Sequence, residues 1–363
     1  MDDDLAIVVL PCSRLLDRAN DLVEAPHDAR FAIAHQMELF RQRAGGSYLD
    51  IFRALCQNRC RIRRTLCHAI RDWEAVQAEA EETDHLLQVQ LDEKPMHYST
   101  SITSTGGEPA YSFPLSSWAY LYKLRMMEWI VQLGFELEIY QADELAGMYW
   151  YLSFLANARV QHVERIKAFT MQRFNEMRAQ PFVLTAAMEN QFTRSFSFLR
   201  ATTLDASVNW EFGDALSCLY TVLDRLKLVV PPPRPYGTDE LRYETRMKPF
   251  GYIGLPALPS YEMFVRATAQ PEMKTRTLLD IAQRGLAGVK KGLDVLGKLS
   301  EKEAFTSMGG THEKWIGRTK DCLKSVIAAG IAVAAVRKAL DGKEEGYGGL
   351  YKGEFVSVKR GWG

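Results

Sequence analysis

The chain has 363 residues, of which 47% are hydrophobic, so it can bury a sizeable core in one large domain or two smaller ones. Lys plus Arg and Asp plus Glu number 45 each, so no overall field attracts the chain to specific DNA sites, RNA or a membrane surface. The N-terminus is acidic where a signal peptide is basic, and the longest apolar run, residues 326–336, is too short to span a bilayer, so we expect a cytoplasmic protein.

Residues 1–95 are predicted to be a helical region that contains one long helix with a regular seam. From Phe52 to Ala80 the seam residues alternate by three and four, which is typical of a helix that lies along another long helix. Arg59 falls on this seam. Because an unpaired buried charge is too costly to keep, its guanidinium should reach either a carboxylate or water.

Charge is distributed along this helix in an unusual order, with basic residues first and acidic residues last. That order opposes the helix dipole, so local helix stability does not explain it. The basic members around Arg59 are Arg53, Arg61, Arg63, Arg64 and Arg71. A partner surface explains the order, and a solvated face with internal salt bridges is the alternative. On the first interpretation we predict that Arg59, Arg61, Arg63, Arg64 and Trp73 bind a partner.

Three of the six cysteines lie on the same helix, close to a histidine. They are Cys56, Cys60 and Cys67, followed by His68. A metal site is one interpretation of this spacing, and small half-buried residues in a reducing compartment are the favoured one. We therefore predict no metal ligands.

After a Ser/Thr/Gly/Pro-rich loop at 96–114, the central region 115–229 begins with a predicted helical hairpin. The apolar residues of its first helix recur every three or four positions, which predicts one wide apolar face and an end at Gly134. Asp143 and Glu144 predict the start of the second helix, with the hairpin's acids at a cap or on the polar side. Three aromatic residues of this packing surface are predicted partner contacts: Trp118, Trp129 and Tyr140.

The last third of the chain alternates between helix and irregular structure. Clustered prolines predict a stiff, irregular connector at 230–260, and an SH3-type ligand is the less favoured interpretation. Helices are expected within 261–341, near 274–298 and 313–340, the first of them loosened by three glycines. The tail, 342–363, is Gly-rich with a short strand-like piece. These patterns predict an all-α fold: an elongated array of antiparallel helix pairs with Pro-rich irregular connectors and a Gly-rich tail.

Two segments together carry a family resemblance: QNRCRIRRTLCHAIRDWE at 57–74 and WAYLYKLRMMEWIVQLGFELEIYQADELAGMYWYL at 118–152. They resemble the large auxiliary subunit of the NatC N-terminal acetyltransferase, in the expected order and at a plausible separation. The resemblance covers only the C-terminal half of that family protein. Three interpretations of Met1 stay open: a true start, a fragment boundary or a gene-model artefact. Because only half of the family protein is matched, we expect weak or partial assembly by the isolated chain.

The resemblance implies a non-catalytic scaffold subunit rather than an enzyme. It also implies a catalytic partner of the acetyltransferase fold, a small Sm-like auxiliary subunit, and action near the ribosome on nascent chains that begin with Met and a hydrophobic residue. Acetyl-CoA and the catalytic groups would belong to the partner.

The residues support this division of labour, because the chain has no strict Q/R-x-x-G-x-G/A turn for coenzyme A. The nearest match, residues 343–348, carries two acids that would repel phosphate. We therefore predict no catalytic, cofactor-binding or metal residues. Two alternatives stay open: a helical module that contacts the ribosome or RNA through the arginines of residues 53–71, and an all-helical enzyme whose site forms from distant residues.

Overall fold

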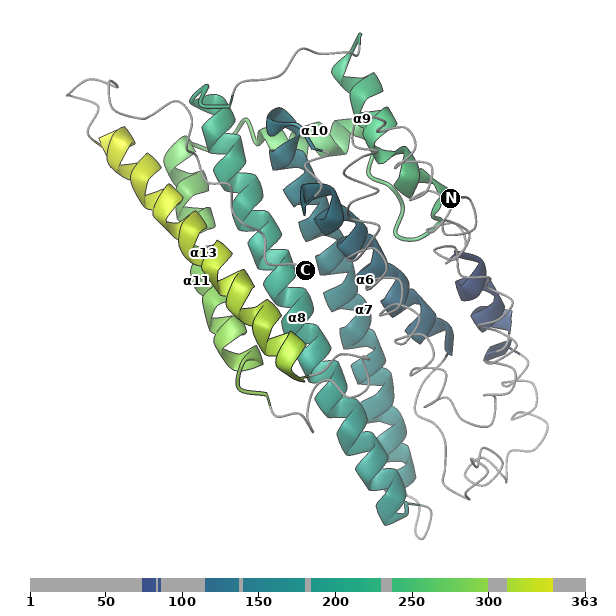
Figure 1. The fold of residues 1–363 in the computed structure, drawn as a ribbon. Helices are drawn as coiled ribbons and strands as arrows, with labels where there is room; N and C mark the ends of the chain where they lie inside the picture. The colour runs from purple at the N-terminus through teal and green to yellow at the C-terminus, as the bar shows by residue number, and fades with distance from the viewer. Residues whose placement is uncertain are drawn as a thin grey trace, which may run out of the picture.

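The computed structural model describes residues 74–82, 84–85, 115–136, 140–179, 184–229, 237–299 and 312–341. Within them all regular structure is helical, which confirms the predicted all-α fold. The long helices lie side by side in an elongated array, and two short ones lie near one end of it (Figure 1). The long helices are α6 (Leu115–Glu136), α7 (Leu145–Ala179), α8 (Ala186–Arg225), α11 (Thr275–Leu296) and α13 (His312–Asp341); the short ones are α9 (Asp239–Met247) and α10 (Tyr261–Ala269).

Consecutive long helices run antiparallel, as the pairing of their side chains shows. Along α7 and α8, Arg159 contacts Asp205, and further along α7 Phe174 packs against Phe192. Residue numbers therefore rise on one helix as they fall on the other. This arrangement is the predicted array of antiparallel helix pairs, and it buries one continuous apolar core shared by α6, α7, α8, α11 and α13.

The predicted hairpin of α6 and α7 is present, but its first helix differs from the prediction in two ways. Gly134 does not end the helix: α6 continues to Glu136, and Gly134 leaves room for the Tyr140 ring, which a Cβ at this position would overlap. The buried surface of α6 is also wider than one face, because the neighbouring helices cover it on several sides. Its buried residues include Leu121, Tyr122, Lys123, Leu124, Met127, Glu128, Ile130 and Val131.

The glycines of α11 serve a different purpose from the one predicted. A Cβ at Gly285 would lie 3.1 Å from the Ala215 Cβ, and one at Gly292 would lie 2.6 Å from a Val208 methyl group. These glycines face α8 and let the two helices approach closely. The expectation that they loosen the helix was therefore wrong, since α11 is regular from Thr275 to Leu296.

The segment predicted to be irregular through Pro259 contains α9 and the short 3-10 helix η3 (Lys248–Tyr252). The hydroxyl of Thr238 accepts a hydrogen bond from the Leu241 N–H, and Asp239 and Glu240 complement the dipole in the first turn. These local signals for a helix start were present in the sequence. The prolines on either side led to the wrong prediction of a continuous connector.

A buried network of charges joins α6, α7 and α8. The guanidinium of Arg159 is fully buried; it donates to both carboxylate oxygens of Glu128, at 2.5 and 2.9 Å, and to Asp205 Oδ2 at 2.9 Å. Arg125 also pairs with Asp205, and the Asn209 amide donates to Glu128 at 2.8 Å. Burial lowers the pKa of Arg159, but the two carboxylates outweigh it and raise that pKa above its ordinary value. Glu128, predicted to lie at a cap or on the polar side, is therefore a buried partner.

Candidate partner-binding pocket

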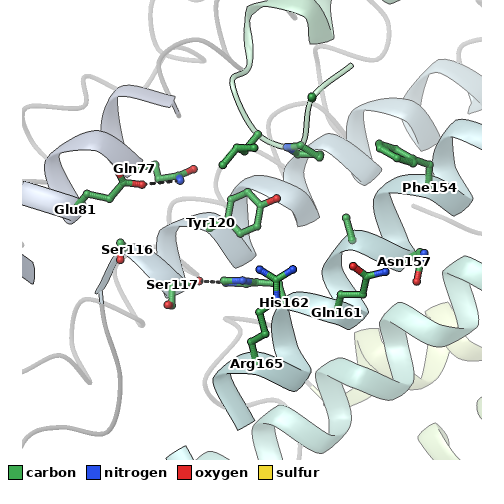
Figure 2. Close-up of a pocket in the computed structure, with 14 residues that line it drawn as sticks. Gln77, Glu81, Ser116, Ser117, Tyr120, Phe154, Asn157, Gln161, His162 and Arg165 are labelled. Carbon is green, nitrogen blue, oxygen red and sulfur yellow. Dashed lines mark hydrogen bonds between the residues drawn. The ribbon is translucent and has the colours of Figure 1, made fainter. Parts of the chain in front are cut away.

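An open pocket of about 500 Å³ lies where residues 74–82, the start of α6, the middle of α7 and the loop around Pro256 meet. We call it the His162 pocket. Figure 2 shows Tyr120 between Gln77 on one side and His162 on the other. Several of its lining residues are exposed, so the pocket opens to solvent along one side. The exposed members are Glu81, Gln161, Arg165, Leu255 and Ala257.

The floor of the pocket is a polar row on α7. Asn157, Gln161 and Arg165 are spaced four residues apart, so they follow one face of the helix. Phe154, at the end of the row, adds an aromatic surface (Figure 2). None of the three polar side chains has a hydrogen-bonding partner among the described residues. They are therefore available to a molecule that enters the pocket.

His162 lies beside this row and is held by two contacts. Its Nε2 is 2.7 Å from the Ser117 carbonyl oxygen, and its ring packs edge-on against Tyr120 with 4.6 Å between centroids. Because a carbonyl oxygen only accepts, Nε2 must carry a proton. Burial lowers the pKa of His162; the Ser117 contact opposes this effect, and the charges of Arg165 and Lys123 add to it. The neutral ring then leaves Nδ1 as an acceptor.

We expect the stability of the folded chain to fall as the pH drops below the ordinary His pKa of 6.5. The unfolded chain binds a proton to this imidazole near that pH, whereas the folded chain binds it only at lower pH. The stabilisation is thus complete above 6.5 and is lost as the pH falls through the folded pKa. Urea unfolding across this range should show a shallower pH dependence for His162→Gln. His85→Gln is the matched control, because His85 is exposed. Equal slopes for the two variants would contradict the assignment.

Glu74 ties together the elements that surround the pocket. One of its carboxylate oxygens accepts from Lys123 Nζ of α6 at 2.7 Å, and the other accepts from the Gly254 N–H of the loop at 3.2 Å. The Lys123 ammonium is fully buried, and burial lowers its pKa although the Glu74 carboxylate opposes the shift. On the next turns of the same segment, the Gln77 amide donates to Glu81 at 2.9 Å (Figure 2). The pocket is therefore held by contacts between residues distant in sequence.

A second pocket, of about 370 Å³, lies beside α9, and part of its lining is an internal cluster of ion pairs. The Arg242 guanidinium donates to both oxygens of Asp143, at 2.6 and 2.7 Å, and Arg246 donates to both oxygens of Glu144, at 2.8 and 2.6 Å. Burial raises the pKa of Glu144, but Arg246, the Gln141 N–H and the Arg242 charge together outweigh it, and the net pKa is lowered. These bidentate ion pairs fasten α9 to the residues just before α7. Because the charges neutralise one another, this pocket is the weaker candidate for a binding site.

The residues predicted from the sequence to bind a partner lie outside the His162 pocket or outside the described residues. Arg59, Arg61, Arg63, Arg64 and Trp73 precede the first described residue, and the side chains of Trp118 and Trp129 are also not described. The Tyr140 ring packs against Phe135, with 4.9 Å between centroids, and the Arg246 guanidinium lies 5.4 Å from its centre. The role of these residues in partner binding stays a prediction. The signal that could have found the pocket is the i, i+4 spacing of Asn157, Gln161 and Arg165.

The described residues lack two common classes of functional feature. They contain no group of three or more His, Cys, Asp or Glu side chains placed to hold a metal ion. In the same part of the chain, no helix is both long enough and apolar enough to cross a membrane. The cysteine cluster of residues 56–67 and the strand-like piece of the tail lie outside the described residues.

Comparisons with known proteins point to one family. A family model described as NAA35-like, TPR repeats, matches residues 7–343. The N-alpha-acetyltransferase 35, NatC auxiliary subunit, of Gallus gallus is 23% identical over 249 residues, which is 62% of this chain and 31% of the relative. Its Saccharomyces cerevisiae counterpart is 22% identical over 248 residues, 61% of this chain and 30% of the relative. The matched part of the chain thus spans about a third of the length of these relatives.

Solved structures share the fold. A chain in the crystal structure of the apo NatC complex aligns with a TM-score of 0.61 and 17% identity. A chain in the NatC complex bound to Gag peptide and CoA aligns with the same TM-score and 16% identity. In both cases the alignment covers 84% of this chain and 44% of the other.

Proposed function

This chain belongs to the NAA35-like family of TPR-repeat proteins, and from that premise we propose that it is a non-catalytic auxiliary subunit of a NatC-type N-terminal acetyltransferase. The observation that carries the proposal is the family match across residues 7–343, which includes nearly the whole chain. Its relatives carry the name of the NatC auxiliary subunit. The proposal assigns acetyl-CoA binding and catalysis to a separate partner subunit.

The physical role that we propose is that of a rigid scaffold. The charged groups at the centre of the array form internal ion pairs, since Arg159 pairs with both Glu128 and Asp205. Such a network orders α6, α7 and α8 relative to one another, which suits a surface that must hold a partner in one orientation. In this role the chain holds the catalytic subunit, together with a small Sm-like subunit, for nascent chains that begin with Met and a hydrophobic residue, in the cytoplasm near the ribosome.

Co-expression of the full chain with the catalytic and small subunits of the same cell tests this function. We expect the chain to retain the catalytic subunit in substoichiometric amount, in line with the partial assembly predicted from the sequence. We expect the purified chain alone not to transfer acetyl groups from acetyl-CoA. Failure to retain the catalytic subunit, or acetyl transfer by the chain alone at an enzymic rate, would overturn the proposal. A stoichiometric, active ternary complex would contradict only the expectation of partial assembly.

A further inference from the structure

The spacing of the polar row on α7 matches the spacing of an extended polypeptide. Four residues of an α-helix rise about 6 Å, so Asn157, Gln161 and Arg165 present polar groups at that interval. Two residues of an extended strand span about 6.6 Å, and the backbone groups that face one side recur at that interval. The two repeats differ by only about a tenth, so a strand lying along α7 can stay in register with the row across all three positions.

The hydrogen-bonding capacity of the pocket also suits a polypeptide backbone. Each of the Asn157 and Gln161 amides offers a donor and an acceptor, as a backbone amide does. On the facing wall, the Gln77 Oε1 is buried without a hydrogen-bonding partner, while the Nε2 of the same side chain donates to Glu81. A buried acceptor without a partner is unfavourable, and an N–H group of an occupant can satisfy it once the Gln77 side chain turns toward the pocket. The pocket thus presents unmet polar groups on two facing walls.

The charges in the pocket favour an acidic residue at one end of the bound segment. Arg165 is exposed and has no carboxylate partner among the described residues. The other cation nearby, Lys123, is already paired with Glu74, and the neutral His162 adds no charge. The one carboxylate of the described lining, Glu81, accepts from Gln77 on the facing wall. The free positive charge of the pocket is therefore concentrated at Arg165, where an Asp or Glu of the occupant would form a charge-assisted hydrogen bond.

The pocket suits an extended chain better than a small compound. Pockets for small ligands enclose about 70–90% of the ligand surface and are lined predominantly by apolar groups. Here the apolar lining is shared by Tyr120, Phe154 and the loop at 255–257, and Leu255 is 60% exposed. The pocket is open and its lining mixes polar with apolar groups, so it can contact one side of a strand and leave the other side in solvent.

We propose that the His162 pocket binds an extended segment of the catalytic partner subunit, with its backbone along Asn157 and Gln161 and an acidic side chain at Arg165. This inference rests on the proposed function, because that function supplies the partner. Leu255 and Phe154 then contact the apolar side chains that alternate with the polar positions of the segment.

The test uses the full chain and overlapping fluorescent peptides that together span the sequence of the catalytic subunit. We expect at least one acidic peptide to bind, with an affinity reduced about tenfold by Asn157→Ala combined with Gln161→Ala, since two hydrogen bonds are lost. Arg165→Glu should weaken the same peptide by at least a similar factor. Replacing the acidic residue of the peptide with Lys should restore binding to the Arg165→Glu variant and weaken binding to the unaltered chain.

Gln172→Ala and Arg178→Glu are the matched controls, because both residues are exposed on α7 beyond the pocket and should leave binding unchanged. Thermal unfolding of each variant checks that the fold persists. If the catalytic subunit co-purifies with the chain but none of its peptides binds, or if binding is insensitive to the pocket variants, the inference is overturned and the proposed function stands. If the catalytic subunit does not co-purify at all, the proposed function fails as well.

Discussion

Replacing Arg159 with methionine lowers the free energy of unfolding by about 3–5 kcal/mol, because it leaves two carboxylates without their shared buried partner. The side chains of Glu128 and Asp205 are 1% and 6% exposed, so water cannot replace the lost guanidinium. Methionine keeps much of the side-chain volume, which limits the contribution of a cavity. Urea unfolding of the full chain measures the effect.

The control for this prediction is Arg178→Met on the same helix. Arg178 is exposed near the end of α7, so its replacement should change the unfolding free energy by no more than about 0.5 kcal/mol. Adding Glu128→Gln to Arg159→Met should recover part of the loss, since Asp205 still pairs with Arg125 whereas Glu128 keeps only the neutral Asn209 amide. A loss under about 1 kcal/mol for Arg159→Met would show that the network is not the main link between α6, α7 and α8.

Replacing Gly213 with alanine lowers the free energy of unfolding by about 1–3 kcal/mol, because the added methyl group meets backbone atoms of α7. A Cβ at Gly213 would lie 2.9 Å from both the Ser153 nitrogen and the Tyr149 carbonyl oxygen. Backbone atoms inside a helix cannot move aside as a flexible side chain does. The two longest described helices, α7 and α8, must therefore separate locally to accept the change.

Gly330→Ala provides the opposite result from the same chemical change. Gly330 lies inside α13, and a Cβ there meets no atom within 4 Å. Alanine should therefore stabilise the chain by up to about 1 kcal/mol through its better helix propensity. Thermal unfolding of both variants compares the signs directly. If Gly213→Ala were also stabilising, the close approach of α7 and α8 in the structure would be refuted.

The two predictions bear on the His162 pocket because α7 carries both the contacts that these variants disrupt and the polar row of the pocket. His162 follows Arg159 by one turn of α7, and Tyr149 and Ser153 precede the polar row that begins with Asn157. The contacts that fasten α7 to α6 and α8 therefore also fix how Asn157, Gln161 and Arg165 face the pocket. A variant that loosens these contacts should weaken partner binding as well as stability.

Local patterns along the chain determined the fold class and most helix positions. Helical spacing of apolar residues marked α6, α7, α11 and α13. Two family-specific segments at 57–74 and 118–152 indicated the NatC auxiliary family, which the family match confirmed. These signals are readable because periodicity, caps and motif residues lie within a few turns of one another.

Only the tertiary structure decided which polar residues are buried and which remain free. Glu128 and Arg159 are 31 residues apart, and Glu74 meets Gly254 across 180 residues, so no local pattern reveals either contact. A charged residue on a helix looks the same in sequence whether a distant partner neutralises it or solvent surrounds it. The free energy of burial depends on that partner. For this reason the ion network and the His162 pocket emerge from the packing of the helices and not from any single segment.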